Sequence, residues 1–208
     1  MEVKQLIQET DDDCGGPTCV AMITKQSIAD VKKEMKTYDR GTYMVQLAAY
    51  LRHCGFSVIY HYFNPLFLRL SDENNCSSDR LIAKLFTLPK ETKEQKQCFD
   101  YMIHYLRYRK ETIHVSMMTT EMVKTVIDMG GCCLALMTSN YLYPEPHSEF
   151  NYHYNIIVGY DKEDFVIYDP LCKEELHING EKYLHGVYAP TGSEMLDAGS
   201  VLAVYDLR

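Results

Sequence analysis

The stretch that most constrains how this chain can fold runs from residue 8 to residue 19, with the sequence QETDDDCGGPTC. It places Gln8 six residues before Cys14, and two glycines and Pro17 then lead into an apolar run. Proline suits the first turn of a helix, so the run predicts a helix over residues 18–25. A thiol at the start of a helix is well placed to be a nucleophile, because the partial positive charge there favours the thiolate.

Composition indicates one soluble globular domain over residues 1–208. The chain is 46% hydrophobic and 24% charged, and its net charge is −8 with a pI of about 5.5. An acidic balance argues against a nucleic acid or an anionic membrane as partner. No apolar run approaches the roughly 18 residues of a membrane span, and the N-terminus lacks the pattern of a Sec-type signal peptide. We therefore expect a cytoplasmic protein, acting in its own cell or delivered to another.

The cysteines do not form the pattern of a disulfide framework or a metal site. There are eight of them, without a C-x-x-C pair and without histidines at zinc-ligand spacing. Most are expected to be small buried hydrophobic residues. Only Cys14 has a local context that suggests reactivity.

The order of predicted elements favours an α+β fold, with N-terminal helices packed on a C-terminal antiparallel sheet. Besides residues 18–25, helices are expected over 28–35, from 44 to about 53, over 92–110 and from 119 to about 129, with a helical turn at 81–86. Strands are expected at 2–10 (a short edge strand), 56–63, 113–115, 132–138, 174–179 and 200–206. The clearest hairpin pairs residues 153–160 with 165–169. Residues 63–112 are the least patterned part.

That hairpin supplies candidate partners for the thiol. His153 opens its first strand and Asp169 closes the second, so their side chains can meet on one face as a base and the group that orients it. Gln8 and the backbone N–H of Cys14 are candidate donors to an oxyanion. A lone histidine is more often structural, and each residue alone is weak evidence. The hypothesis rests on their co-occurrence in the order Gln, Cys, His, Asp.

These motifs together resemble the C39-like branch of the papain-like cysteine peptidases. The resemblance is carried by Gln8 with Cys14-Gly15, by the run CVAMI at residues 19–23, and by HYNIIVGYD through IYDP at residues 153–170. Residues 119–136 are similar to the helix and strand that precede the histidine in that family. The length and residues 140–142 also resemble the eukaryotic group labelled guanylylate cyclase domain proteins. The resemblance is weak from 63 to 112, which we interpret as a variable insertion.

The resemblance implies a papain-like α+β fold, a peptide or protein substrate and no cofactor. Cys14 would be the nucleophile, His153 the general base, Asp169 its orienting group and Gln8 part of the oxyanion hole. Gly15, Gly16 and Tyr152, which adjoin the nucleophile and the base, would contact substrate.

One departure from the family pattern concerns the position of the thiol. In C39-like sequences an Ala-Met pair follows the cysteine by six and seven residues, whereas Ala21 and Met22 follow Cys14 by seven and eight. Either one residue is inserted at Gly15-Gly16, or Gly15 occupies the nucleophile position. The spacing between Gln8 and Cys14 favours the insertion, while the acidic residues 11–13 oppose formation of the thiolate.

Three functions therefore stay open at the level of sequence. The first is a cysteine-dependent peptidase or related thiol amidohydrolase. The second is a catalytically inactive papain-like module that binds peptides, with the aromatic and prolyl loop at residues 140–147 as a recognition surface. The third is a nucleotide cyclase, suggested only by the label of the similar group, since the chain has no glycine-rich phosphate loop and no cluster of basic residues. The sequence does not predict an oligomeric state.

Overall fold

The fold is centred on a seven-stranded sheet with the strand order β2-β1-β7-β3-β4-β5-β6. The computed structural model describes residues 1–8, 15–35, 42–108, 111–143, 152–189 and 196–207. The strands are β1 (Phe56–Tyr62), β2 (Ile113–Val115), β3 (Cys132–Thr138), β4 (Tyr152–Asp161), β5 (Asp164–Tyr168), β6 (Leu176–Asn179) and β7 (Ser200–Asp206). Neighbouring strands are antiparallel except β1 and β2, which are parallel.

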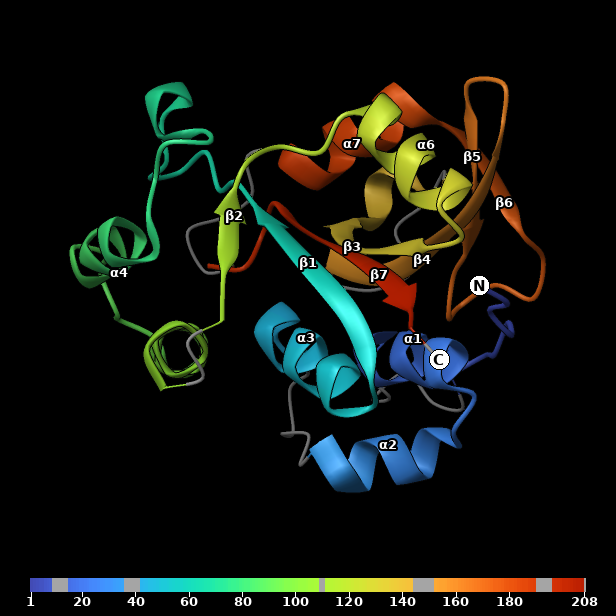
Figure 1. Cartoon of the computed structure of the whole chain (residues 1–208), viewed down its shortest axis with the longest axis horizontal. Coiled ribbons are helices and arrows are strands. Elements are labelled where there is room, and N and C mark those ends of the chain that lie inside the picture. The colour runs from blue at the N-terminus through green and yellow to red at the C-terminus, as the bar shows by residue number, and fades with distance from the viewer. Residues whose placement is uncertain (9–14, 36–41, 109–110, 144–151, 190–195, 208) are drawn as a thin grey trace.

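Helices cover both faces of the sheet (Figure 1). On one side lie α1 (Gly15–Thr24), α2 (Ile28–Met35) and α3 (Met44–His53), with α1 in contact with β4 and α3 with β1. On the other side α6 (Thr120–Asp128) and α7 (Gly180–Tyr188) contact β3. The α+β class is therefore confirmed, and the sheet also takes in β1 and β2 from the first part of the chain.

The central strand β3 shows how two cores are built on one sheet. All of its residues are buried, because helices cover it from both sides. Successive side chains of a strand point to opposite faces. Cys132, Leu134 and Leu136 accordingly join the core under α1 and α3, whereas Cys133, Ala135 and Met137 join the core under α6 and α7. The continuous apolar run that predicted a buried strand has this physical cause.

Residues 63–108 form a largely helical segment beside the β2 edge of the sheet (Figure 1). It holds the short 3-10 helix η1 (Leu70–Asp72), α4 (Ser78–Phe86), α5 (Lys93–Ile103) and a π-helical turn, η2 (His104–Tyr108). The buried Asp72 carboxylate accepts hydrogen bonds from the Arg69 N–H and ion-pairs with Arg80 at 2.9 Å and Lys84 at 3.0 Å. Asp72 thereby ties η1 to α4.

Several local predictions are confirmed and others are wrong. α2 and β7 have the expected bounds, and the Thr119 side chain caps α6 by accepting from the Met122 N–H. The edge strand at residues 2–10 is wrong over its described part: residues 1–8 make no ladder, and single backbone bonds from Lys4 to Met22 and from Gln8 to Pro170 attach them instead.

Two other differences concern helices. α7 was not predicted at all, and the helix expected over 92–110 is α5 followed by the π-helical turn η2.

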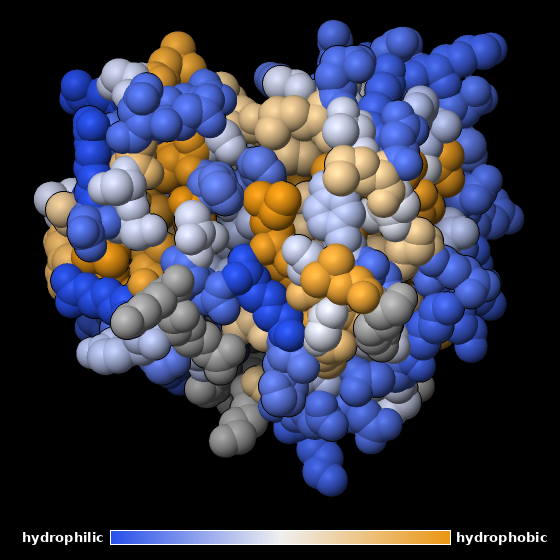
Figure 2. Space-filling model, viewed as in Figure 1, coloured by the Kyte–Doolittle hydropathy of each residue, from blue (hydrophilic) through white to orange (hydrophobic). Residues whose placement is uncertain are grey.

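The surface is mainly polar on the face that Figure 2 shows, with hydrophobic residues in patches between hydrophilic ones. None of the helices within the described residues combines the length and the apolarity needed to cross a lipid bilayer.

Candidate functional site

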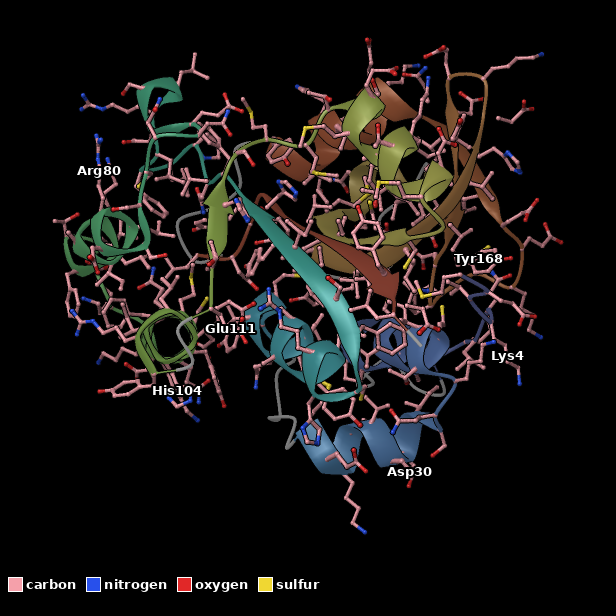
Figure 3. The ribbon with its side chains drawn as sticks, viewed as in Figure 1. Lys4, Asp30, Arg80, His104, Glu111 and Tyr168 are labelled. Atoms are coloured by element: carbon pink, nitrogen blue, oxygen red, sulfur yellow. The ribbon has the colours of Figure 1, made fainter. Side chains whose placement is uncertain are left out.

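The hairpin of β4 and β5 brings His153 and Asp169 together. The ladder pairs Ile156 with Tyr168, and Asp169 follows immediately at the end of β5, near the labelled Tyr168 in Figure 3. Asp169 is fully buried, and its Oδ1 lies 3.0 Å from His153 Nε2. The same oxygen accepts a hydrogen bond from the Leu171 N–H at 2.8 Å. The carboxylate is thus fixed in position and engages the Nε2 edge of the imidazole ring.

The other nitrogen of His153 is directed to the start of α1. Gly15 is the first residue of α1, and a Cβ built on it would lie 3.0 Å from His153 Cε1 and 3.4 Å from Nδ1. Gly15 therefore leaves the space beside the ring that a side chain would fill. The backbone N–H groups of the first helical turn, which carry partial positive charge, begin at this same point.

Gln8 lies beside the same hairpin. Its backbone N–H donates to the Pro170 carbonyl at 2.9 Å, which attaches it to the residue after Asp169. Its side-chain Oε1 is buried and has no hydrogen-bond partner in the described part of the chain. Gln8 and the His153–Asp169 pair, distant in sequence, are thus neighbours in the fold.

The remaining predicted residues occupy different environments. Gly16 is buried, and a Cβ on it would press on the Thr42 hydroxyl and the Leu47 side chain, so it serves the packing of α1 against α3. Tyr152 is half-buried, begins β4 and pairs with Thr138 of β3. Cys14 lies outside the described residues, as do the acidic residues 11–13.

Two polar residues that sequence reasoning did not single out belong to the same part of the fold, Asn155 and Tyr143. Asn155, fully buried in β4, accepts a hydrogen bond at Oδ1 from the Tyr183 hydroxyl of α7. Burial and, to a lesser extent, the negative charge of Asp169 raise the pKa of Tyr143. The available signal for Asn155 was its spacing, since residues two apart in a strand share a face with each other and hence with His153.

Three of the other cysteines are chemically unlike a reactive thiol. The seven described cysteines are all free thiols. Burial raises the pKa of Cys132 to about 12 and raises the pKa of Cys98 and of Cys133 as well. A thiol with a raised pKa is inert, because the thiolate is the nucleophile.

No cluster suited to metal binding is found in the ranges that the structure describes: no three His, Cys, Asp or Glu residues gather there around a common point.

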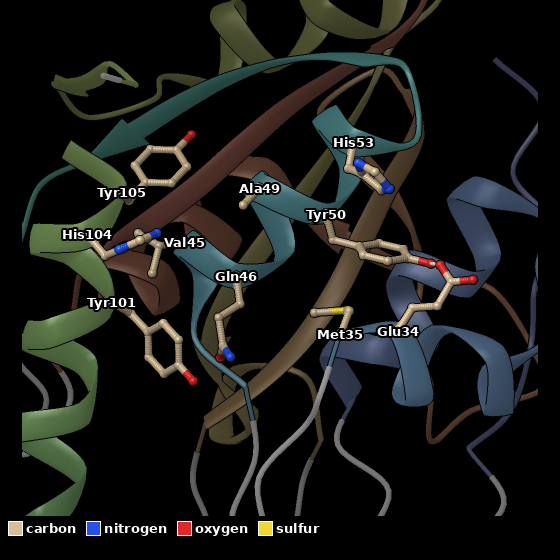
Figure 4. Close-up of a pocket in the computed structure, with 10 residues that line it drawn as sticks. All are labelled: Glu34, Met35, Val45, Gln46, Ala49, Tyr50, His53, Tyr101, His104 and Tyr105. Atoms are coloured by element: carbon tan, nitrogen blue, oxygen red, sulfur yellow. Dashed lines mark hydrogen bonds between the residues drawn. The ribbon is translucent and has the colours of Figure 1, made fainter. Parts of the chain in front are cut away.

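A separate pocket of about 680 Å³ lies between α2, α3 and α5 (Figure 4). The Tyr50 hydroxyl donates to the Glu34 carboxylate along its wall. Its lining is aromatic and polar: Glu34, Met35, Val45, Gln46, Ala49, Tyr50, His53, Tyr101, His104 and Tyr105. None of the predicted site residues belongs to it.

Comparisons with known proteins gave structural likenesses only. No family model matches the chain, and no curated protein is similar to it. Among solved structures, the chain is similar to the peptidase domain of Streptococcus ComA, a bi-functional ABC transporter involved in a quorum sensing pathway, at 14% identity and a TM-score of 0.48 over 97% of each chain. It is also similar to a putative C39-like peptidase from Bacillus anthracis, at 16% identity and a TM-score of 0.31, over 42% of this chain and 47% of that one.

Proposed function

We propose that this chain is a cysteine-dependent hydrolase, a peptidase or a related thiol amidohydrolase, with a papain-like arrangement of Cys14, His153 and Asp169. The observation that carries the proposal is the position of His153, between the buried Asp169 carboxylate and the first residue of α1. Cys14 is joined to Gly15 by one peptide bond, and consecutive Cα atoms are about 3.8 Å apart. The proposal puts the thiol within reach of the ring nitrogen that Asp169 does not engage.

In the proposed mechanism, His153 Nδ1 takes the proton of the Cys14 thiol. The thiolate attacks the carbonyl carbon of an amide, which forms a C–S bond and places negative charge on the carbonyl oxygen. The protonated Nδ1 then gives its proton to the leaving nitrogen as the C–N bond breaks. Water then attacks the thioester carbon while Nδ1 accepts a proton from the water. The C–S bond breaks, Nδ1 returns the proton to sulfur, and the carboxylic acid leaves.

The neighbouring residues have matching proposed roles. Asp169 Oδ1 accepts the Nε2–H of His153, which fixes the tautomer with Nδ1 free and stabilises the imidazolium. Gln8 turns its side-chain amide, with the Cys14 N–H, toward the oxyanion, where each such donor contributes about 10²–10³ in kcat. Gly15 leaves room for substrate beside His153, and Tyr152 and Gly16 border that space.

The wider proposal covers domain, substrate and compartment. The proposed substrate is a peptide or protein. The proposed domain spans residues 1–208, with 63–112 as a variable insertion. The proposed compartment is the cytoplasm. The free state of the seven described cysteines agrees with a reducing compartment. The similarity to the guanylylate cyclase group stays a prediction.

A second candidate, a papain-like module that binds peptides without cleaving them, is favoured by one observation. A Cβ on Gly15 would lie 3.4 Å from His153 Nδ1, so position 15 itself faces the ring. If Gly15 occupies the nucleophile position of the family pattern, the groove remains and the chemistry is lost.

Alkylation of the thiols at pH 5.5, followed residue by residue by mass spectrometry, tests the proposal. At this pH a thiol of ordinary pKa is almost fully protonated, whereas one paired with an imidazolium is largely thiolate. Cys76 is an internal reference, because it is partly exposed and burial raises its pKa. We expect Cys14 to react at least about tenfold faster than Cys76, and His153→Ala to remove this difference. Equal rates at Cys14 with and without His153 would rule out the proposed pair.

A further inference from the structure

Two buried polar atoms near the proposed site have no hydrogen-bond partner among the described residues. Asn155 is fully buried, and its Nδ2 has no hydrogen-bond partner among the described residues. Asp169 is also fully buried, and its Oδ2 makes no hydrogen bond of normal geometry in the same part of the chain. An amide donor and a carboxylate acceptor left in this state are costly, since buried polar groups nearly always find partners.

The register of the hairpin places these two residues opposite each other. The ladder pairs Ile157 with Ile167 and Ile156 with Tyr168, so one further step sets Asn155 opposite Asp169. Directly opposite residues have Cβ atoms about 5 Å apart on one face of the sheet, and diagonal neighbours about 7–8 Å apart. His153 is the diagonal neighbour, and Asp169 Oδ1 reaches it. The second oxygen of Asp169 is then the one left for Asn155.

The orientation of the Asn155 amide is set from its other end. The Tyr183 hydroxyl donates to Asn155 Oδ1, so the oxygen of the amide is directed to α7 and the NH₂ group is directed away from it. Tyr183 is fully buried, and burial, with a smaller contribution from the charge of Asp169, raises its pKa. The reverse orientation would turn the amide oxygen toward a carboxylate, which is electrostatically unfavourable.

We infer that Asn155 is a positioning residue that donates its amide to Asp169 Oδ2, so that Tyr183, Asn155 and Asp169 act in series to hold His153. Its contribution to catalysis rests on the proposed function, whereas its effect on His153 does not. Both oxygens of Asp169 then accept hydrogen bonds: Oδ1 from the Leu171 N–H and from His153, and Oδ2 from Asn155. Asp169 also contributes to raising the pKa of Tyr143.

Nitrogen-15 NMR of the histidine rings tests the inference without any substrate. In the wild-type protein we expect neutral His153 to carry its proton at Nε2. Asn155→Leu keeps the size of the side chain and removes the donor, so Asp169 loses its fixed orientation. We expect the fraction of the Nδ1–H tautomer to rise, by about threefold or more, because an Asp169 carboxylate without a fixed orientation holds the Nε2–H of His153 less firmly. An unchanged tautomer ratio in folded Asn155→Leu would overturn the inference.

Asn64→Leu is the matched control. Asn64 is a buried asparagine that donates to the Leu196 carbonyl, away from His153, so the same chemical change there should leave the His153 signal unaltered. If Asn155→Leu fails to fold, Tyr183→Phe removes only the hydroxyl that orients the amide, and a smaller shift in the same direction is expected. A His153 signal identical to wild type in folded Tyr183→Phe would then contradict the inference.

The two proposals fail in different ways. Slow alkylation of Cys14, together with a changed His153 tautomer ratio in Asn155→Leu, would rule out the proposed hydrolase function and support the role of Asn155. A reactive Cys14, together with an unaltered His153 signal in Asn155→Leu, would support the proposed hydrolase function and rule out the role of Asn155. Where turnover is measurable, loss of positioning lowers kcat by about tenfold with KM unchanged, because the interaction acts on the base and not on the substrate.

Discussion

Moving the thiol by one residue separates the two functions that the site supports. The double variant Cys14→Ala/Gly15→Cys places a thiol on the residue whose Cβ would lie 3.4 Å from His153 Nδ1. One more bond brings Sγ into contact with the ring, at the start of α1. Thiols next to an imidazolium and a helix N-terminus have pKa values of about 3.5–7.5, against about 8.5 for a free thiol.

The expected gain can be worked out for a thiol whose pKa falls to about 5.5, the middle of that range. At pH 5.5 the thiolate fraction rises from about 0.1% to about 50%, or roughly 500-fold. The nucleophilicity of each thiolate falls by roughly 20-fold over three pKa units, because the Brønsted coefficient is about 0.4–0.5. The net gain in alkylation rate is therefore about 25-fold over an ordinary thiol.

The two functions predict opposite results when the alkylation rates are followed by mass spectrometry at pH 5.5. If the protein is a hydrolase, Cys14 of the wild type shows the increased alkylation rate, and the double variant does not hydrolyse peptides. For a binding module, Cys14 reacts slowly and the thiol at position 15 shows the gain. Gly15→Ala controls for the added Cβ, which must displace His153 slightly. If neither thiol exceeds Cys76 in rate, His153 does not pair with a thiol at this helix start, and the reasoning is refuted.

Three further predictions concern stability. Burial and the neighbouring His114 lower the pKa of His61 to about 4. Because the unfolded chain binds this proton near pH 6.5, the free energy of unfolding should fall by up to about 3 kcal/mol as the pH drops from 6.5 to 4. In urea titrations, His61→Phe should weaken this dependence of the free energy of unfolding on pH. Asp72→Asn should lower the thermal midpoint of the protein and the amide-exchange protection of α4, whereas Asp79→Asn, at an exposed residue, should change both little. The Asp72 carboxylate stabilises the fold only when it is ionised, so this stabilisation is lost as the pH falls through its lowered pKa. Gly199 has a φ of 75° and its Cβ would collide with the Phe63 carbonyl, so Gly199→Ala should cost about 2–4 kcal/mol in chemical denaturation, and an unchanged midpoint would show that the backbone there relaxes freely.

Elements with strong local signals could be predicted from the sequence. α2 begins after Ser27, whose hydroxyl accepts from the Asp30 N–H, and α3 ends at Cys54-Gly55, where Gly55 has a φ of 90°. Caps and helix-ending glycines depend on neighbours within a few residues, so they can be read from the chain itself. The hairpin of β4 and β5 was equally predictable, and with it the meeting of His153 and Asp169.

α7 shows why other elements could not be predicted. Its apolar residues Tyr183, Leu184 and Val187 keep helical spacing, but Gly180 and Gly186 lower the helix propensity of the segment. The structure explains both glycines by long-range packing. A Cβ at Gly180 would press on the Phe165 ring, and one at Gly186 on Met137 and Tyr141. The composition of this helix therefore reflects the sheet it covers, which local reasoning does not include.

The position of the nucleophile depends on the same kind of packing. A Cβ at Gly16 would collide with the Thr42 hydroxyl, and one at Gly15 would crowd the His153 ring, so both glycines are adapted to their neighbours in the fold. If the extra residue relative to the C39-like pattern lies before the helix, between Gln8 and Gly15, then Gly15 occupies the nucleophile position, as in the second candidate function. A thiol at position 15 would project toward Nδ1 from the helix itself, whereas the thiol of Cys14 depends on how residues 9–14 approach the helix. Spacing from Gln8 and spacing from the helix thus give different registers, and the reactivity of the two thiol positions distinguishes them.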